Sequence, residues 1–167
     1  HTDAEIITDY SGFGGGGRKL EGSVLYRVPW RIEASRTGYL YLNTAISKVR
    51  VNQPDGWDVT DPPTIAANDI HALACEAVGI EDFKDMRMYT ALGSSLDAYH
   101  GCDAFLEFMD PESDSSQIIT LDITKDPVKY LKGHKADVIV FGNHADVAAN
   151  DIAELMEKRR VYQAAVA

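Results

Sequence analysis

The sequence predicts an α/β (α+β) fold in which a mixed central sheet is flanked by helices. From residue 64 onward, segments with helical spacing of apolar residues are interspersed with short segments of strand-like alternation. Three strand-like segments follow one another closely, whereas a fourth comes after a longer crossover, so both antiparallel and parallel neighbours are expected. The predicted order is helix, strand, strand, strand, short helix, strand, helix, after a β-rich N-terminal extension.

The first third of the chain is predicted to be this extension. A glycine-rich run at residues 12–17 is typical of a loop. Residues 23–51 are rich in Val, Tyr, Ile and Trp, which favours two or three strands. The segment NQPDGWDVTDPP at residues 52–63 is predicted to be a linker. We therefore divide the chain into an extension, 1–63, and a core, 64–167.

The core elements are predicted from periodicity and from residues that begin or end elements. Residues 64–79 form a helix that ends at Gly79, and a final helix begins at Asn150 or Asp151 and continues to about residue 165. Between them the pattern predicts strands at 86–92, 102–108, 117–124 and 136–141, with a short helical turn at 126–131.

Composition narrows the class of protein. The chain has 167 residues and no apolar run long enough to span a bilayer, so we expect a soluble, cytoplasmic protein. Its two cysteines, Cys75 and Cys102, have no metal-ligand spacing and lie in apolar stretches. Two buried thiols are therefore favoured over a disulfide.

The charge of the chain is unevenly distributed. The net charge of -10 argues against a protein that binds polyanions over its whole surface. Residues 18–50 carry seven Lys/Arg and two Glu, whereas residues 51–116 carry fourteen Asp/Glu and two Lys/Arg. A lysine-rich segment follows at residues 125–135. Such a distribution suits a metal site beside a phosphate-binding rim, although solvated surface charge would also account for it.

Two aspartates stand on polar faces of otherwise apolar strands. In CDAFLEF, alternation places Asp103, Phe105 and Glu107 on one face, and in IITLDIT it places Asp122 and Thr124 on one face. If the strands are neighbours, Asp103 and Asp122 lie side by side. Two such carboxylates repel each other unless a cation lies between them, and oxygen ligands favour Mg²⁺ or Mn²⁺.

The stretch LDAYHGCDAFLEF, the following ITLDITKDP and the later KADVIVFG resemble the PD-(D/E)xK nuclease superfamily, which has a restriction-endonuclease-like core. That family's core runs helix, three strands, helix, strand, as predicted here from residue 64 to about 142. The resemblance implies a divergent, metal-dependent nuclease with Asp103 as the first acid and Asp122 as the acid of the (D/E)xK element.

The chain departs from this pattern at the lysine. Thr124 stands where the family has its lysine, and Cys102 precedes Asp103 where the family has proline. We expect Lys135, or failing that Lys125, to supply the missing amine from the turn after the strand. The structural alternative is that Asp122 is buried and paired with Lys135 or Thr124.

Other residues have a functional and a structural interpretation. Glu107 and Asp97 are candidate further metal ligands, and His100 is a candidate proton carrier. A solvated strand end for Glu107 and turn contacts for Asp97 and His100 are the alternatives.

Basic and aromatic residues are interleaved near the N-terminus. This pattern suits phosphate contact with base stacking, although an edge sheet with core aromatics would also produce it. The candidates for binding nucleic acid are Arg27, Trp30, Arg31 and Arg36, with Tyr39 and Tyr41 nearby.

The expected function is thus a metal-dependent phosphodiesterase, with DNA favoured over RNA as the expected substrate, of the kind found in phages, mobile elements or defence systems. It would use Mg²⁺ or Mn²⁺ and need no membrane. The alternatives are a non-catalytic member of the same fold that binds nucleic acid or protein, and an acidic protein that mimics DNA. A homodimer or a protein partner is left open.

Overall fold

A computed structural model describes residues 24–29, 39–124, 135–141 and 144–166. Within these ranges the chain forms helices, one 3-10 turn and four strands. In chain order they are α3 (Leu42–Val51), α4 (Ile65–Val78), η2 (Phe83–Asp85), β1 (Met86–Thr90), α5 (Ser95–His100), β2 (Ala104–Met109), β3 (Ser116–Thr124), β4 (Val138–Phe141) and α7 (Ala145–Val166).

The four strands form one mixed sheet in the order β1-β2-β3-β4. The pairs β1–β2 and β2–β3 are antiparallel, and β3–β4 is parallel. A parallel neighbour requires the chain to cross over, as the longer connection after residue 124 predicts. The α+β class and the mixed sheet are therefore confirmed.

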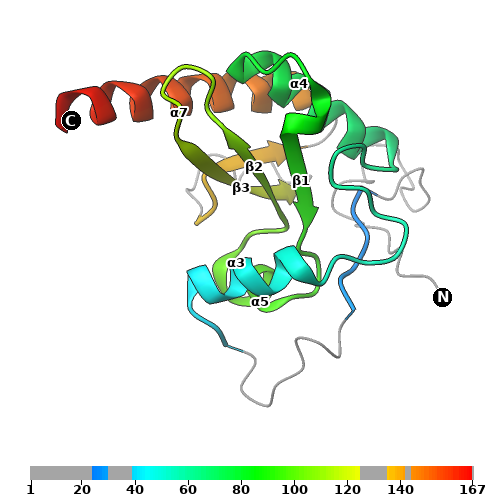
Figure 1. The fold of residues 1–167 in the computed structure, drawn as a ribbon. Helices are drawn as coiled ribbons and strands as arrows, with labels where there is room; N and C mark the ends of the chain where they lie inside the picture. The colour runs from blue at the N-terminus through cyan, green and yellow to red at the C-terminus, as the bar shows by residue number, and fades with distance from the viewer. Residues whose placement is uncertain (1–23, 30–38, 125–134, 142–143, 167) are drawn as a thin grey trace.

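Helices lie on both sides of the sheet (Figure 1). α4 and α7 pack on one face, where alternate residues such as Leu106 of β2 and Leu121 of β3 enter the larger core. α3 and α5 lie on the other face, where Phe105 and Tyr89 enter a second core with Ile46. The period-two prediction for β2 and β3 thus agrees with the observed faces.

The predicted helix at residues 64–79 is confirmed as α4. Thr64 caps its N-terminus by accepting a hydrogen bond from the N–H of Ala67, at 3.1 Å. Gly79 ends the helix with φ of 87°, a left-handed conformation that glycine adopts without a steric cost.

Three element predictions need correction. Residues 42–51 form helix α3 rather than a strand, because Ala45, Ile46 and Val49 are spaced to bury one helical face. The SLDAYH segment, which was interpreted as a turn, is helix α5. α7 begins at Ala145, so the predicted caps at residues 150 and 151 lie inside the helix. The short helical turn predicted at 126–131 lies outside the described residues.

The segment at residues 52–63 is packed rather than a linker. Trp57 is buried, and its indole N–H donates to the carbonyl of Met88 at 2.9 Å. The backbone N–H of Met88 donates to the carbonyl of Val59, so this segment covers the β1 edge. Val24 and Leu25 enter the same core as α4. Residues on both sides of the proposed boundary at residue 63 therefore share one core. In the described residues before α3, β-structure is limited to bridge residues at Tyr26 and Arg27, and Arg27 pairs with Leu92.

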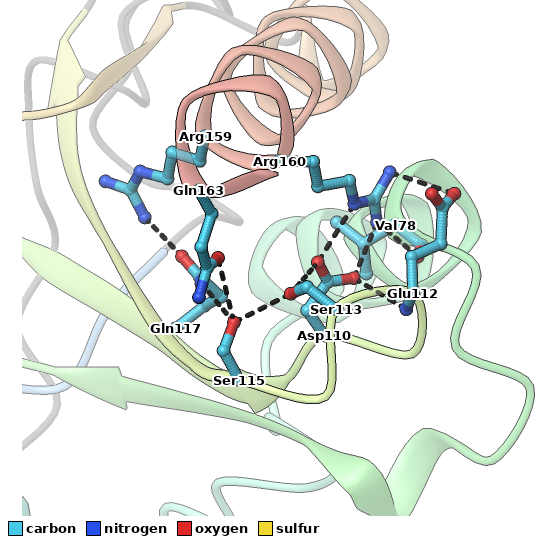
Figure 2. A network of polar contacts seen from close by, with 9 residues as sticks. All are labelled: Val78, Asp110, Glu112, Ser113, Ser115, Gln117, Arg159, Arg160 and Gln163. Carbon is cyan, nitrogen blue, oxygen red and sulfur yellow. Dashed lines mark hydrogen bonds and ion pairs between the residues drawn. The ribbon is translucent and has the colours of Figure 1, made fainter. Parts of the chain in front are cut away.

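The turn between β2 and β3 is held to α7 by a polar network (Figure 2). Arg160 donates two hydrogen bonds to the carboxylate of Asp110, at 2.9 and 2.7 Å, and a third to the carbonyl of Val78 at the end of α4. The Asp110 side chain is fully buried, and it also accepts hydrogen bonds from Ser113 and from the N–H of Glu112. One arginine thus joins a hairpin and two helices.

Cys75 and Cys102 are both unpaired and buried, as predicted. Burial raises the pKa of each thiol to about 11. None of the helices in the described ranges has both the length and the apolar character that crossing a membrane would need.

Candidate functional site

Asp103 and Asp122 lie at the same end of the β2–β3 strand pair. Asp103 immediately precedes β2, and Asp122 lies within β3, the antiparallel neighbour of β2. The register ends with Ala104 opposite Leu121, and Asp103 contacts the backbone of Leu121 and Ile123, the residues on either side of Asp122. Leu121 enters the α4/α7 core, so the next residue, Asp122, points to the α3/α5 side.

Asp103 is held by backbone groups on both sides, its carboxylate by β3 and its main chain by β3 and by Ala91, just after β1. Its Oδ2 accepts a hydrogen bond from the N–H of Ile123 at 2.8 Å. Its backbone N–H donates to Leu121, and its carbonyl accepts from Ala91. With these three contacts, the position of Asp103 is set by β3 on one side and by the end of β1 on the other.

Asp97 reaches Asp103 from helix α5. Ser94 caps this helix by accepting from the N–H groups of Leu96 and Asp97. The Asp97 Oδ2 accepts from the N–H of Gly93 at 2.8 Å, and the Asp97 and Asp103 carboxyl groups are hydrogen-bonded to each other. Asp97, from the segment between β1 and β2, is therefore a third acid, next to the two that were predicted from the strands.

The electrostatics of this group favour a cation. Burial, the charge and hydrogen bond of Asp97, and the charge of Asp122 together raise the pKa of Asp103 to about 9. A carboxyl with such a pKa holds its proton at neutral pH unless another positive charge replaces it. A cation bound at this site would offset the repulsion of Asp103 by the carboxylates of Asp97 and Asp122.

Asp122 and Thr124 are both buried near the end of β3. Thr124 stands two residues after Asp122 on the same face, at the place of the family lysine. β4 runs parallel beside this stretch, with Asp122 opposite Ile139 and Thr124 opposite Phe141. A hydroxyl therefore occupies the position where the resemblance calls for an amine.

The candidate lysines are only partly described. Lys125 lies outside the described residues. The Lys135 Nζ donates to the carbonyl of Tyr99 at 3.3 Å, and its aliphatic chain passes Gly101. The amine therefore lies at the C-terminal end of α5, the helix that carries Asp97.

Glu107 does not belong with these acids, which corrects its place among the candidate metal ligands. Its carboxylate accepts two hydrogen bonds from Arg50 of α3, at 3.2 and 3.0 Å, and lies 3.6 Å from Arg87. It stands four residues beyond Asp103, which in a strand is a separation of roughly 13 Å. Glu107 joins α3 to the sheet instead.

Arg27 lies close to the acids. Its backbone forms a parallel bridge with Leu92, and a Cβ atom at Gly93 would come within 2.4 Å of its Nη1 atom. The guanidinium therefore passes over the same glycine whose N–H binds Asp97. The other candidates for binding nucleic acid, Trp30, Arg31 and Arg36, lie outside the described residues.

The His100 ring is used locally. Its Nε2 atom is 2.7 Å from the carbonyl of Leu40, and the ring packs against Tyr39. Tyr99, the residue before it, was missed in the sequence although it lies between two candidate residues, Asp97 and His100. SLDAYH has only six residues and was interpreted as a turn, so no periodic signal indicated a helix here.

A hollow of about 350 Å³ lies between β4 and α7. Its lining includes Asp137, Asp151, Glu154 and Lys158 and does not include Asp103 or Asp122. The Asp137 carboxylate already accepts from the N–H of Thr120, at 3.0 Å, and lies 3.4 Å from Arg159. The acids beneath α5, rather than this hollow, form the candidate site.

The donor set at the candidate site fits a hard divalent cation. Within the ranges that the structure covers, no three His, Cys, Asp or Glu side chains are arranged to chelate an ion. Mg²⁺ commonly takes only one or two carboxylates and completes its shell with water and substrate phosphate. Asp103 and Asp122 are the two carboxylates that such an ion would use here, with Asp97 beside Asp103.

Comparison of the chain with protein-family models, with curated proteins and with solved structures gives no significant match.

Proposed function

We propose that the protein is a metal-dependent phosphodiesterase that cleaves DNA, with Asp103 and Asp122 holding Mg²⁺ or Mn²⁺. The observation that carries this proposal is the proximity of Asp103 and Asp122 at the end of one antiparallel strand pair. Asp122 is buried and Asp103 is partly buried, and bringing carboxylates together away from water is costly unless they bind protons, cations or hydrogen-bond donors.

The order of elements supports the same proposal. α4 is followed by three antiparallel strands, a crossover and the parallel strand β4. The described elements match the first helix, the three strands and the last strand of the restriction-endonuclease-like core, and the helix expected in the crossover lies outside the described residues. Helix α5, inserted between β1 and β2, is an addition to that pattern and delivers Asp97.

Each residue has a distinct role in the proposal. Asp103 and Asp122 would provide the metal ligands, and Asp97 positions Asp103 through their hydrogen bond. When bound, the ion would activate a water molecule and neutralise the charge that develops on the phosphate. Arg27, beside Gly93, is placed to hold a neighbouring phosphate by its guanidinium.

The lysine remains to be assigned, and we expect Lys135 to provide it. Replacing Lys135 with Ala should leave Mn²⁺ affinity within about twofold, because an ammonium group has no lone pair to bind a metal. It should lower the cleavage rate by about 100-fold, the ordinary size of a proton-transfer or charge-stabilising contribution. The measurements are Mn²⁺ calorimetry and cleavage of a labelled DNA by each variant.

Lys125→Ala is the matched comparison, because it tests the other lysine of the same segment. Unchanged cleavage in both single variants would remove lysine from the mechanism. Cleavage itself tests the proposed function: labelled single-stranded and duplex DNA should be cut in Mn²⁺ and left intact in EDTA.

A non-catalytic binding module is the second candidate function. The buried hydroxyl of Thr124 in the lysine position favours it, since a Thr has no charge to offer the reaction. This candidate predicts binding of nucleic acid without cleavage in any divalent ion. The cleavage assay therefore separates the two functions directly.

A further inference from the structure

Three tyrosines gather on the surface at the C-terminal end of α5. Tyr39 packs edge-to-face against Tyr41 and against Tyr99, with ring centroids 5.7 and 5.4 Å apart. The three rings remain substantially exposed, at 46% for Tyr39, 77% for Tyr41 and 42% for Tyr99. In a T-shaped pair the faces of the edge-on ring are not covered by its partner, so the cluster presents ring faces to solvent.

The cluster contributes little to either core. The α3/α5 core is filled by residues such as Phe105, Leu96 and Ile46, and none of the three tyrosines belongs to it. Large aromatic side chains ordinarily bury most of their surface, and contiguous exposed apolar patches are uncommon on soluble domains unless they bind something. These rings are therefore better explained by a ligand than by the stability of the fold.

The cluster is linked to the candidate site through α5. Tyr99 is two residues after Asp97, which places the two side chains on different sides of this helix. His100, three residues after Asp97, shares its side of the helix and packs against Tyr39, with ring centroids 5.5 Å apart. The rings therefore lie at the C-terminal end of the short helix whose Asp97 contacts Asp103.

Positive charge lies beside the rings. The Lys135 amine binds the carbonyl of Tyr99 and is exposed. Helix α3 begins directly after Tyr41 and has no acidic residue in its first turn, so the positive end of its dipole is at the same place. Aromatic faces beside an ammonium group are suited to a flat base attached to a phosphate.

We propose that Tyr39, Tyr41 and Tyr99 form a stacking platform for unpaired bases of single-stranded nucleic acid. A base paired within a duplex is covered by its neighbours and cannot lie on a side-chain ring. The platform therefore selects substrates with an unpaired segment next to the cleaved phosphate. This inference deepens the proposed function, from which it takes only the identity of the neighbouring acids as the cleavage site.

The test is binding of a fluorescent twelve-nucleotide oligo-dT, of the matching oligo-U, and of a blunt twelve-base-pair duplex. The titrations use the full chain in Ca²⁺ at one fixed salt concentration. The variants are Tyr99→Leu and Tyr41→Leu, which keep an apolar side chain but remove the ring, and Tyr99→Phe, which keeps it. Tyr162→Leu is the matched control, because Tyr162 is an exposed tyrosine (69%) on α7.

The platform predicts that the wild-type protein binds at least one single strand more tightly than the duplex. Tyr99→Leu and Tyr41→Leu should each weaken that binding by about tenfold or more, the ordinary effect of losing a base–aromatic stack. Tyr99→Phe and Tyr162→Leu should stay within about twofold of wild type. Oligo-dT and oligo-U together show whether the strand is DNA or RNA, and either preference supports the platform.

Two results would overturn the inference. One is binding of single strands by both leucine variants as tightly as by the wild-type protein, and the other is equal or tighter binding of the duplex. Calorimetry with Mn²⁺ separates this from the proposed function. If Mn²⁺ binds through the aspartates but the tyrosine substitutions do not change binding of single strands, the proposed function stands and the platform is refuted. If the tyrosine substitutions weaken binding of single strands but no Mn²⁺ binds, the platform stands and the proposed function is refuted.

Discussion

Replacing Asp122 with Asn should abolish metal-dependent cleavage, and Asp103→Asn should do the same. Each change removes an anionic ligand while preserving the size of the side chain. Metal-based stabilisation of a phosphodiester reaction contributes several kcal/mol, so we expect a loss of at least about 100-fold in the cleavage rate. The measurement is the single-turnover rate on a labelled DNA in Mn²⁺.

Unfolding should not explain that loss. Ionisation of Asp103 is disfavoured in the folded protein, as its raised pKa shows, so a neutral amide there should be tolerated. Glu107→Gln is the matched control, because Glu107 is on the same face of β2 but binds Arg50. It should retain cleavage within about threefold. Equal losses in Glu107→Gln and Asp103→Asn would mean that the assay reports folding rather than the site.

Replacing Arg160 with Met should have the largest effect on stability. The change leaves the Asp110 carboxylate fully buried without its bidentate partner. Breaking a buried ion pair in this way costs about 3–5 kcal/mol of the free energy of unfolding. For a chain of this size the melting temperature should fall by about 6–20 °C, as measured by circular dichroism.

This pair also predicts a dependence on pH. The hydrogen bonds from Arg160 hold the pKa of Asp110 well below its usual range. Its stabilising contribution is therefore complete above the unfolded-state pKa of about 3.9 and is lost as the pH falls through and below that value. The wild-type protein should lose more stability than Arg160→Met between about pH 5 and pH 3.

Arg159→Met provides the control for Arg160. Arg159 is the preceding residue on α7, but its ion pair with Asp137 is partly exposed on both sides, at 29% and 34%, and its other contacts are hydrogen bonds to Gln117 and to the carbonyl of Ile118. Neither partner becomes a buried unpaired charge when Arg159 is replaced, so this variant should lose clearly less stability than Arg160→Met. Similar melting temperatures for the two variants would contradict the role given to the buried pair in Figure 2.

The strand pattern was the most predictive part of the sequence. Alternation in β2 and β3 depends only on which residues face a core, and Leu106 and Leu121 are apolar because they enter one. The same alternation predicts Asp103 and Asp122 on one face if the two strands are neighbours. The strands do pair, as consecutive strands commonly do, but β2 begins at Ala104, one residue after Asp103.

Helices outside the sheet were harder to predict because local composition and tertiary packing disagree. Residues 42–51 contain β-branched residues that favour strands, yet Ala45, Ile46 and Val49 bury a helical face against the sheet. α5 has six residues, too few for a periodic signal. Because α5 was not predicted, neither the contact of Asp97 with Asp103 nor the exposed position of Tyr99 could be predicted.

The partner of an acid depends on tertiary contacts and cannot be derived from its own segment. Glu107 was a reasonable ligand from its strand face, but Arg50, 57 residues earlier, binds it. Asp110 falls between the strands predicted at 102–108 and 117–124, and nothing in that segment indicates its partner Arg160, 50 residues later. Both arginines come from helices whose packing on the sheet is a property of the whole fold.

The most direct test of a metal site at Asp103 and Asp122 is a calorimetric titration of the metal-stripped protein with Mn²⁺. The wild-type protein should bind one Mn²⁺ ion. Asp103→Asn and Asp122→Asn should each weaken binding by at least about tenfold, because each removes an anionic oxygen ligand of the kind that such ions prefer. Glu107→Gln should bind like wild type. Equal Mn²⁺ affinity in wild type and both aspartate variants, or no binding by the wild-type protein, would contradict the proposed site.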